Sequence, residues 1–277
     1  MSDRNTVAVL RDENSTMPDH SSATMRELSR VREYWNQYVI GIEITDKEIG
    51  TKGFFHDLEN YCRDFGNDSH LLDYNKYKGK KLLEVGCGWG DALMRFAEGG
   101  AEVTGVDLSE SAINLAKKYF EHKNLPANLR VGNAEELEFK DGEFDVAVST
   151  GVLHHTPDTQ KGIDELYRVL KPNGEAVVML YNKYSWYNFL CVVSGTNFEH
   201  QEKDAPIVKL YSKGQVLEMF RKFRKVEVDI TRAPAKTIKR NGLLSSLYNN
   251  AFVPLYSLMP TRLTKPFGFH IIIRAIK

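Results

Sequence analysis

Apolar residues follow two alternating patterns from about residue 80 onward. Short apolar runs, typical of buried strands, occur at Lys81–Val85, Glu102–Val106, Leu129–Val131, Phe144–Ser149 and Glu175–Leu180. Helical spacing separates these runs, at Asp91–Glu98, at Glu110–His122 with Ser109 as its cap, and at Thr159–Leu170. This alternation predicts a doubly wound, mostly parallel sheet with helices on both faces.

Turn and capping signals divide the second half of the chain. The tetrapeptide "KPNG" (171–174) predicts a turn before a strand, and "SKGQ" (212–215) is typical of a capping box that opens a helix. A strand is expected at Lys225–Ile230, and the β-branched run "FHIIIRAIK" predicts a last strand. With the five runs above, the sheet has seven strands.

Two helices are expected before the sheet. "TMRE" has the spacing of a capping box at Thr24, and "TKGFFHDLENYCRDF" places its aromatic residues on one helical stripe. We therefore expect a helical cap over residues 24–75, a sheet domain over 76–277 that is large enough for one α/β core, and disorder over the charged residues 1–23. The cap's first helix is a candidate lid.

One long segment before the last strand has the composition of an insertion. Residues 231–268 contain four prolines, aromatic residues and many basic residues, too proline-rich for a strand and too long for a hairpin loop. We expect this segment and the N-terminal helices to cover the carboxyl edge of the sheet.

Composition excludes several classes of function. The 37 basic residues balance the 37 acidic residues, so no global field favours nucleic acid. The three cysteines are widely spaced and fit neither a disulfide framework nor a zinc site, and no metal is expected. No apolar stretch has the length of a membrane span, and the N-terminus lacks a signal-peptide pattern, so a cytoplasmic protein is expected.

The stretch "LLEVGCGWGD" contains a glycine-rich turn between a strand and a helix. Gly86, Gly88 and Gly90 form G-x-G-x-G, whereas the dinucleotide pattern G-x-G-x-x-G would need a glycine at Asp91. The carboxylates of Glu84 and Asp91 bracket the loop and would repel a diphosphate. A ligand with a positive charge, a sulfonium or an ammonium, fits better than NAD.

Two further strand ends supply polar groups. Asp107, followed by Leu108, ends the second strand where nucleotide folds place the acceptor of ribose hydroxyls. Asn133 and the backbone of Ala134 follow the third strand and can read an adenine edge. A ribose, an adenine and a cation together describe S-adenosylmethionine.

With these motifs the chain resembles the class I S-adenosylmethionine-dependent methyltransferases of the small-molecule type. The resemblance covers about residues 80–190, through "LLEVGCGWG", "VTGVDLS", "GNAEEL", "FDVAVSTGVLHHTPD" and "ELYRVLKPNGEAVVMLYNK". The resemblance implies a Rossmann-like fold. It also implies that Glu84 and the Gly86–Gly90 loop contact the methionyl part of the cofactor and that Asp107 contacts the ribose. The adenine would be contacted by Asn133, Ala134 and Glu135. Cys87 lies within the loop but is assigned no chemistry. The family more often has aspartate where Asn133 stands.

Candidate acceptor residues follow the fourth and fifth strands or lie in the N-terminal helix, and the segment 231–268 is expected on the acceptor side. His154 is the candidate general base and His155 a candidate contact with the acceptor; the alternative is that both only hold the loop. Tyr34, Trp35, Tyr181 and Trp186 are either walls of the acceptor site or core residues.

The leading hypothesis is methyl transfer to an oxygen or nitrogen of a small metabolite by a monomer or homodimer. The basic run 221–240 leaves open an anionic or carrier-bound acceptor, although a solvated face is the simpler reading. Two alternatives are a nucleic-acid methyltransferase and a binding protein without turnover. The nucleic-acid methyltransferase is disfavoured by the neutral net charge and by "STGVLHH", which stands in place of an N-P-P-Y type tetrapeptide.

Overall fold

The computed structural model of the chain describes residues 20–39, 41–65, 72–195, 205–231 and 246–277. Its strands are β1 (Lys81–Val85), β2 (Glu102–Asp107), β3 (Asn128–Val131), β4 (Phe144–Thr150), β5 (Leu170–Asn182), β6 (Leu210–Tyr211), β7 (Lys225–Ile230) and β8 (His270–Ile276). Its α-helices are α1 (His20–Gln37), α2 (Lys52–Phe65), α3 (Asp91–Glu98), α4 (Glu110–Lys123), α5 (Thr159–Val169), α6 (Trp186–Ser194), α7 (Lys213–Met219), α9 (Val253–Leu258) and α10 (Thr261–Thr264). Short helical turns are η1 (Ile42–Ile44), η3 (Leu153–His155), η4 (Tyr248–Phe252) and η5 (Lys265–Phe267).

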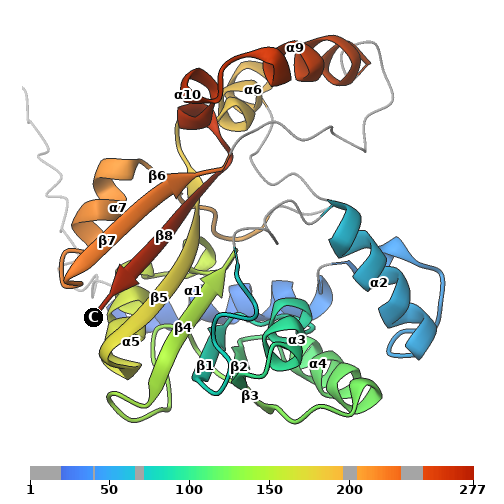
Figure 1. Ribbon diagram of the computed structural model, residues 1–277, viewed down its shortest axis with the longest axis vertical. Helices are drawn as coiled ribbons and strands as arrows, with labels where there is room; N and C mark the ends of the chain where they lie inside the picture. Colours follow the sequence, from blue (N-terminus) through green and yellow to red (C-terminus); the bar gives the residue numbers. More distant parts are fainter. Residues whose placement is uncertain (1–19, 40, 66–71, 196–204, 232–245) are drawn as a thin grey trace, which may run out of the picture.

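The strands form one mostly parallel sheet in the order β3-β2-β1-β4-β5-β8-β7 (Figure 1). Strand β8 is antiparallel to both of its neighbours, and the two-residue β6 pairs with β5 outside this path. The seven strands and the doubly wound class predicted from the sequence are confirmed. The additional β6 is too short to leave a periodic signal.

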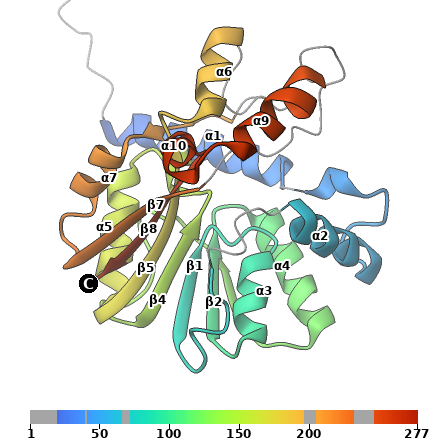
Figure 2. The same cartoon turned by 45° about the horizontal axis from the view of Figure 1, so that its top comes forward.

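Helices cover both faces of the sheet because side chains alternate along each strand. Leu83 of β1 packs in a cluster with α5 and α7, whereas Leu82 packs in a second cluster with α2, α3 and α4. Each layer of helices therefore buries one apolar face, as the near-continuous apolar strands require. Figure 2 shows the same two layers from a tilted view.

The predicted caps mostly hold. Ser109 accepts from the backbone N–H of Ala112 at the start of α4, and Ser212 and Gln215 form a capping box at the start of α7. The box predicted at Thr24 is wrong, because α1 begins at His20 and Thr24 lies inside it. Residues 20–23, expected in the disordered segment, are thus helical, and residues 1–19 lie outside the described part.

The "KPNG" turn interrupts β5 and does not precede it. Pairing jumps from Leu170 to Glu175 while β4 advances only from Phe144 to Val146, and Asn173 adopts a left-handed φ of 64°. The turn is therefore a large bulge within the strand.

The expected insertion 231–268 is helical where the structure describes it. Residues 246–268 form η4, α9, α10 and η5, which lie beside α6 beyond the ends of β5 and β8 (Figure 1). Residues 232–245 lie outside the described part.

Candidate active site

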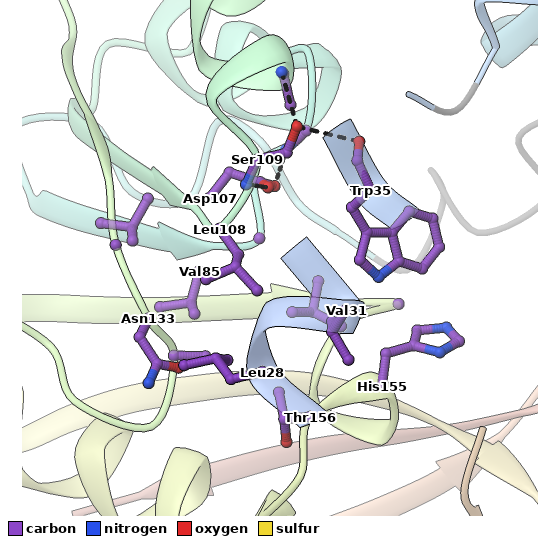
Figure 3. Close-up of a pocket in the computed structure, with 18 of the residues that line it drawn as sticks. Leu28, Val31, Trp35, Val85, Asp107, Leu108, Ser109, Asn133, His155 and Thr156 are labelled. Atoms are coloured by element: carbon purple, nitrogen blue, oxygen red, sulfur yellow. Dashed lines mark hydrogen bonds between the residues drawn. The ribbon is translucent and has the colours of Figure 1, made fainter. Parts of the chain in front are cut away.

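A cavity lies at the carboxyl edge of the sheet, where β1, β2 and β4 end (Figure 3). Its empty volume, including the open mouth, is about 860 Å³. Parallel strands bring their carboxyl ends to one edge, so loops far apart in the sequence meet there. Among the residues predicted for the site, those that line the cavity are Trp35, Gly86, Gly88, Asp107, Leu108, Asn133, Ala134 and His155.

The glycine loop docks on the end of β2. The N–H groups of Gly86 and Cys87 donate to the carbonyl oxygen of Val106 at 2.6 and 3.1 Å, and the N–H of Gly88 donates to Asp107 Oδ2 at 2.8 Å. Gly86 and Gly88 both have a positive φ. A Cβ on Gly86 would lie 2.0 Å from a methyl group of Val152, whereas a Cβ on Gly88 would meet no atom within 4 Å. Gly88 therefore presents bare backbone to the open cavity.

Asp107 faces the same cavity from the end of β2. Its Oδ1 accepts from the N–H of Ser109 at 2.8 Å while its Oδ2 accepts from Gly88. Burial raises the pKa of Asp107, and these N–H groups oppose the shift because they stabilise the charged form. A carboxylate offers about four lone pairs, so two bonds from the backbone leave capacity for a diol.

A third wall follows β3. Asn133 Oδ1 accepts from the N–H of Glu135 at 3.0 Å, which fixes the amide beside Gly132 and Ala134 at the cavity surface. Glu135 itself lies outside the lining: its Oε1 accepts from the N–H of Asp158 at 2.6 Å and ties the β3 loop to the start of α5.

Helix α1 crosses the mouth of the cavity. Leu28, Val31 and Trp35 line it, and Figure 3 shows them opposite the strand ends. The Oγ of Ser109 lies 3.1 Å from the carbonyl oxygen of Trp35 and 3.0 Å from Oδ1 of Asn36, two acceptors for its proton. These contacts fasten the end of α1 to the start of α4.

This site lies within a recognised domain. Residues 83–178 match the family described as a methyltransferase domain. The chain carries a class I methyltransferase domain. S-adenosylmethionine is the cofactor of such a domain. The residues of this chain fit S-adenosylmethionine, because the bare backbone at Gly88, the carboxylate of Asp107 and the amide of Asn133 line one cavity.

Relatives and solved structures agree with this domain. The chain is 35% identical over 121 residues to a ubiquinone biosynthesis O-methyltransferase of Coxiella burnetii. This alignment covers 44% of the chain and 51% of the relative. It is 31% identical over 135 residues to the protein of that name from Rickettsia akari, covering 48% and 53%. The chain thus spans about half the length of the curated relatives it matches. The fold is similar to that of magnesium protoporphyrin IX methyltransferase from Synechocystis, with a TM-score of 0.57 and 13% sequence identity. The match covers 90% of this chain and 99% of that structure.

The adjacent histidines His154 and His155 occupy different environments. His154 is fully buried outside the cavity lining, its ring lies 3.8 Å from that of Tyr181, and neither ring nitrogen has a hydrogen-bond partner among the described residues. Burial, and then the neighbouring His155 and His270, lower the pKa of His154 well below its usual value. The structure therefore does not support the sequence prediction that His154 is the base.

His155 lines the cavity that His154 does not reach. Its Nδ1 lies 2.7 Å from the carbonyl oxygen of Ile207, and its ring stands edge-on to Trp35 at 5.2 Å. A carbonyl only accepts, so Nδ1 carries the proton and Nε2 the lone pair of the neutral ring.

The carboxylates beside the glycine loop also differ from expectation. Asp91 pairs with Arg95 at 3.0 Å. Burial, reinforced by Asp91 and Asp107, raises the pKa of Glu84 well above its usual value, and its Oε2 has no hydrogen-bond partner in the described part of the chain. Neither residue lines the cavity, so the carboxyl group that faces a ligand is that of Asp107.

The remaining predicted site residues lie elsewhere. Gly90 and Cys87 belong to the loop but do not line the cavity: Gly90 precedes α3, and burial raises the pKa of the Cys87 thiol. Tyr34 is buried against Trp35, and Tyr181 stacks on His154. Trp186 packs edge-on to Phe252, away from the cavity lining.

Sequence reasoning missed several lining residues: Leu28, Val31, Trp89, Thr150, Gly151, Val152, Thr156 and Pro157. Leu28 and Val31 share one helical stripe with Trp35, at i, i+3 and i+7, which was a usable signal. Thr150 ends β4, and the others lie in loops whose orientation depends on the assembled sheet.

Proposed function

We propose that the chain transfers the methyl group of S-adenosylmethionine to a hydroxyl oxygen of a small molecule, with His155 as the general base. The observation that supports this proposal is one cavity shared by Gly88, Asp107, Asn133 and His155. The names of the relatives state an O-methylation in ubiquinone biosynthesis. From them we carry over the oxygen acceptor alone; that this oxygen belongs to a phenolic hydroxyl is part of our own proposal.

Each cofactor contact follows from the geometry above. Asp107 would accept the ribose hydroxyls, and Asn133 with Ala134 would contact the adenine. The methionyl part would lie along the backbone of Gly86 and Gly88. Bound there, the cofactor supplies a methyl group on a positively charged sulfur, which needs no metal to react.

The acceptor side requires one proton transfer. A phenol has a pKa of about 10, so at neutral pH its oxygen keeps its proton unless a base removes it. In the proposed step the acceptor oxygen forms a bond to the methyl carbon, the carbon–sulfur bond breaks with its electron pair left on sulfur, and the hydroxyl proton passes to Nε2 of His155. The Ile207 carbonyl holds the ring in the tautomer that accepts this proton.

Helix α1 would exclude water from this step. Leu28, Val31 and Trp35 form an apolar wall over the cavity, and the Ser109 contacts hold that wall against α4. Excluding water strengthens electrostatic interactions at the site and prevents competing reactions.

Transfer of labelled methyl groups tests the proposal. The full chain is incubated with methyl-labelled S-adenosylmethionine and a panel of phenols, amines and carboxylic acids, with RNA and DNA as separate arms. Label in phenols is expected. Label in nucleic acid alone would establish the first alternative, and tight binding of the demethylated product without transfer to any acceptor would favour the second.

A further inference from the structure

Exposed apolar side chains gather on one part of the molecule. Eleven of the sixteen large apolar side chains that are exposed in the described part of the chain belong to residues 183–195 and 246–268. We call these two segments, which contain α6, η4, α9, α10 and η5, the apolar lobe. In Figures 1 and 2 its helices project beyond the ends of β5 and β8. Such a concentration marks an interaction surface.

The apolar lobe has its own interior, which is formed by other side chains than the exposed ones. The ring of Trp186 lies edge-on to Phe252 at 5.3 Å and to Tyr256 at 6.4 Å. The buried hydroxyl of Tyr256 donates to the carbonyl oxygen of Thr264 at 2.7 Å, which joins α9 to α10. The inner faces of the helices are therefore already used.

The outer faces carry the exposed residues on successive short helices. On α6 these are Phe189, Val192 and Val193, and on α9 they are Leu255 and Leu258, with exposed fractions of 73% for Val192 and 83% for Leu258. Side chains that protrude from short helices can enter the acyl boundary of a bilayer without a matching groove.

The charge of the lobe is of one sign. Residues 183–195 and 246–268 contain no aspartate or glutamate, and their basic residues are Lys183, Arg262 and Lys265. Lys265 pairs with Asp229 of β7, whereas Lys183 and Arg262 are exposed to solvent. Apolar side chains beside exposed cations complement a surface of lipid phosphates over acyl chains.

We propose that the apolar lobe docks the chain on the surface of an anionic phospholipid membrane. Association of the lobe with a second copy of itself would bring like charges together, so the lipid surface is the better match. No described helix is long and apolar enough to cross a membrane. The contact is therefore peripheral. This inference does not depend on the proposed methyl transfer, because docking needs neither cofactor nor acceptor.

Flotation with vesicles tests the docking. The full chain is mixed with vesicles of phosphatidylcholine alone or of phosphatidylcholine with phosphatidylglycerol, at low and at high salt. Binding to the anionic vesicles, weakened by salt, is expected. Val192→Asp and Leu258→Asp should each lower the partition coefficient about tenfold or more, because a charge then replaces a buried aliphatic group. Arg262→Gln should lower it about fivefold at low salt.

The matched control is Leu217→Asp on α7. Leu217 is also exposed, at 42%, but lies outside the lobe, so its variant should bind vesicles as the original chain does. Absence of binding to anionic vesicles, or equal loss in the control, would overturn the docking. Light scattering that shows a dimer broken by Leu258→Asp, with no vesicle binding, would assign the surface to a second copy and overturn it too.

Calorimetric titration with S-adenosylhomocysteine separates the two proposals. Unchanged affinity in the lobe variants shows that they are folded. Vesicle binding without methyl transfer would leave docking intact and count against the proposed function alone.

Discussion

Replacing Asp107 by asparagine tests the cofactor assignment with the smallest change of shape. The carboxylate accepts two backbone N–H groups, from Gly88 and Ser109, each at 2.8 Å. Its remaining lone pairs face the cavity. Asparagine keeps the size of the side chain but replaces one acceptor oxygen by a donor.

Two magnitudes follow from this exchange. Hydrogen bonds to a charged group contribute about 1.5–3 kcal/mol, so loss of the ribose bonds should weaken S-adenosylhomocysteine binding about 10–150-fold. The amide NH₂ also faces either Gly88 or Ser109 and leaves that N–H without an acceptor. This should lower the free energy of unfolding by about 1–3 kcal/mol.

Calorimetric titration measures the affinity for S-adenosylhomocysteine, and urea denaturation measures the free energy of unfolding. The matched control is Asp145→Asn, because Asp145 Oδ2 accepts from the N–H of Lys81 at 2.9 Å at the opposite end of β1. Asp145→Asn should lose stability while it keeps its ligand affinity. A folded Asp107→Asn variant that binds S-adenosylhomocysteine as tightly as the control would refute the ribose assignment.

The remaining predictions concern the histidines and the glycine loop. His155→Asn should lower turnover about 10²–10⁴-fold, whereas His154→Phe should leave turnover unchanged; the reverse result would restore His154 as the base. Gly88→Ala should block ligand binding, measured by calorimetry, and should lower the free energy of unfolding by about 1–2 kcal/mol because Gly88 has a positive φ. Gly86→Ala should misfold, because its Cβ would collide with Val152. Tight ligand binding by the Gly88 variant would contradict the contact between the glycine loop and the ligand. His154 has a lowered pKa in the folded chain, so below pH of about 6.5 the unfolded chain binds a proton that the native chain does not, and stability should fall by up to about 1.4 kcal/mol per pH unit as pH decreases. Denaturation of His154→Phe at several pH values should lack this part of the slope, and an unchanged slope would argue against a neutral buried imidazole.

Local sequence signals were sufficient for the sheet and for part of the cavity lining, at Gly86, Gly88 and Asp107. Strand runs, the G-x-G-x-G turn and Asp107 all depend on periods and spacings within a few residues, and parallel strand ends must meet at one edge. The helix start at Thr24 was wrong because a capping pattern inside a helix resembles one at its start.

The acceptor side depended on tertiary structure. His154 and His155 are adjacent, and a sequence pattern has no means to decide which of the two faces a cavity formed by α1, the glycine loop and η3. The Ile207 carbonyl that orients His155 is 52 residues away in the chain. In the same way, Trp186 and Tyr181 are aromatic residues whose partners come from the insertion and from η3.

The sequence by itself therefore determined the order of the strands' apolar runs, the glycine loop and the residues at strand ends, because these follow from short-range periodicity and from the geometry of parallel strands. Only the tertiary structure decided which side chains face the cavity, which carboxyl groups have a raised pKa and which apolar residues stay exposed. Those properties depend on burial, and burial is set by elements distant in the chain.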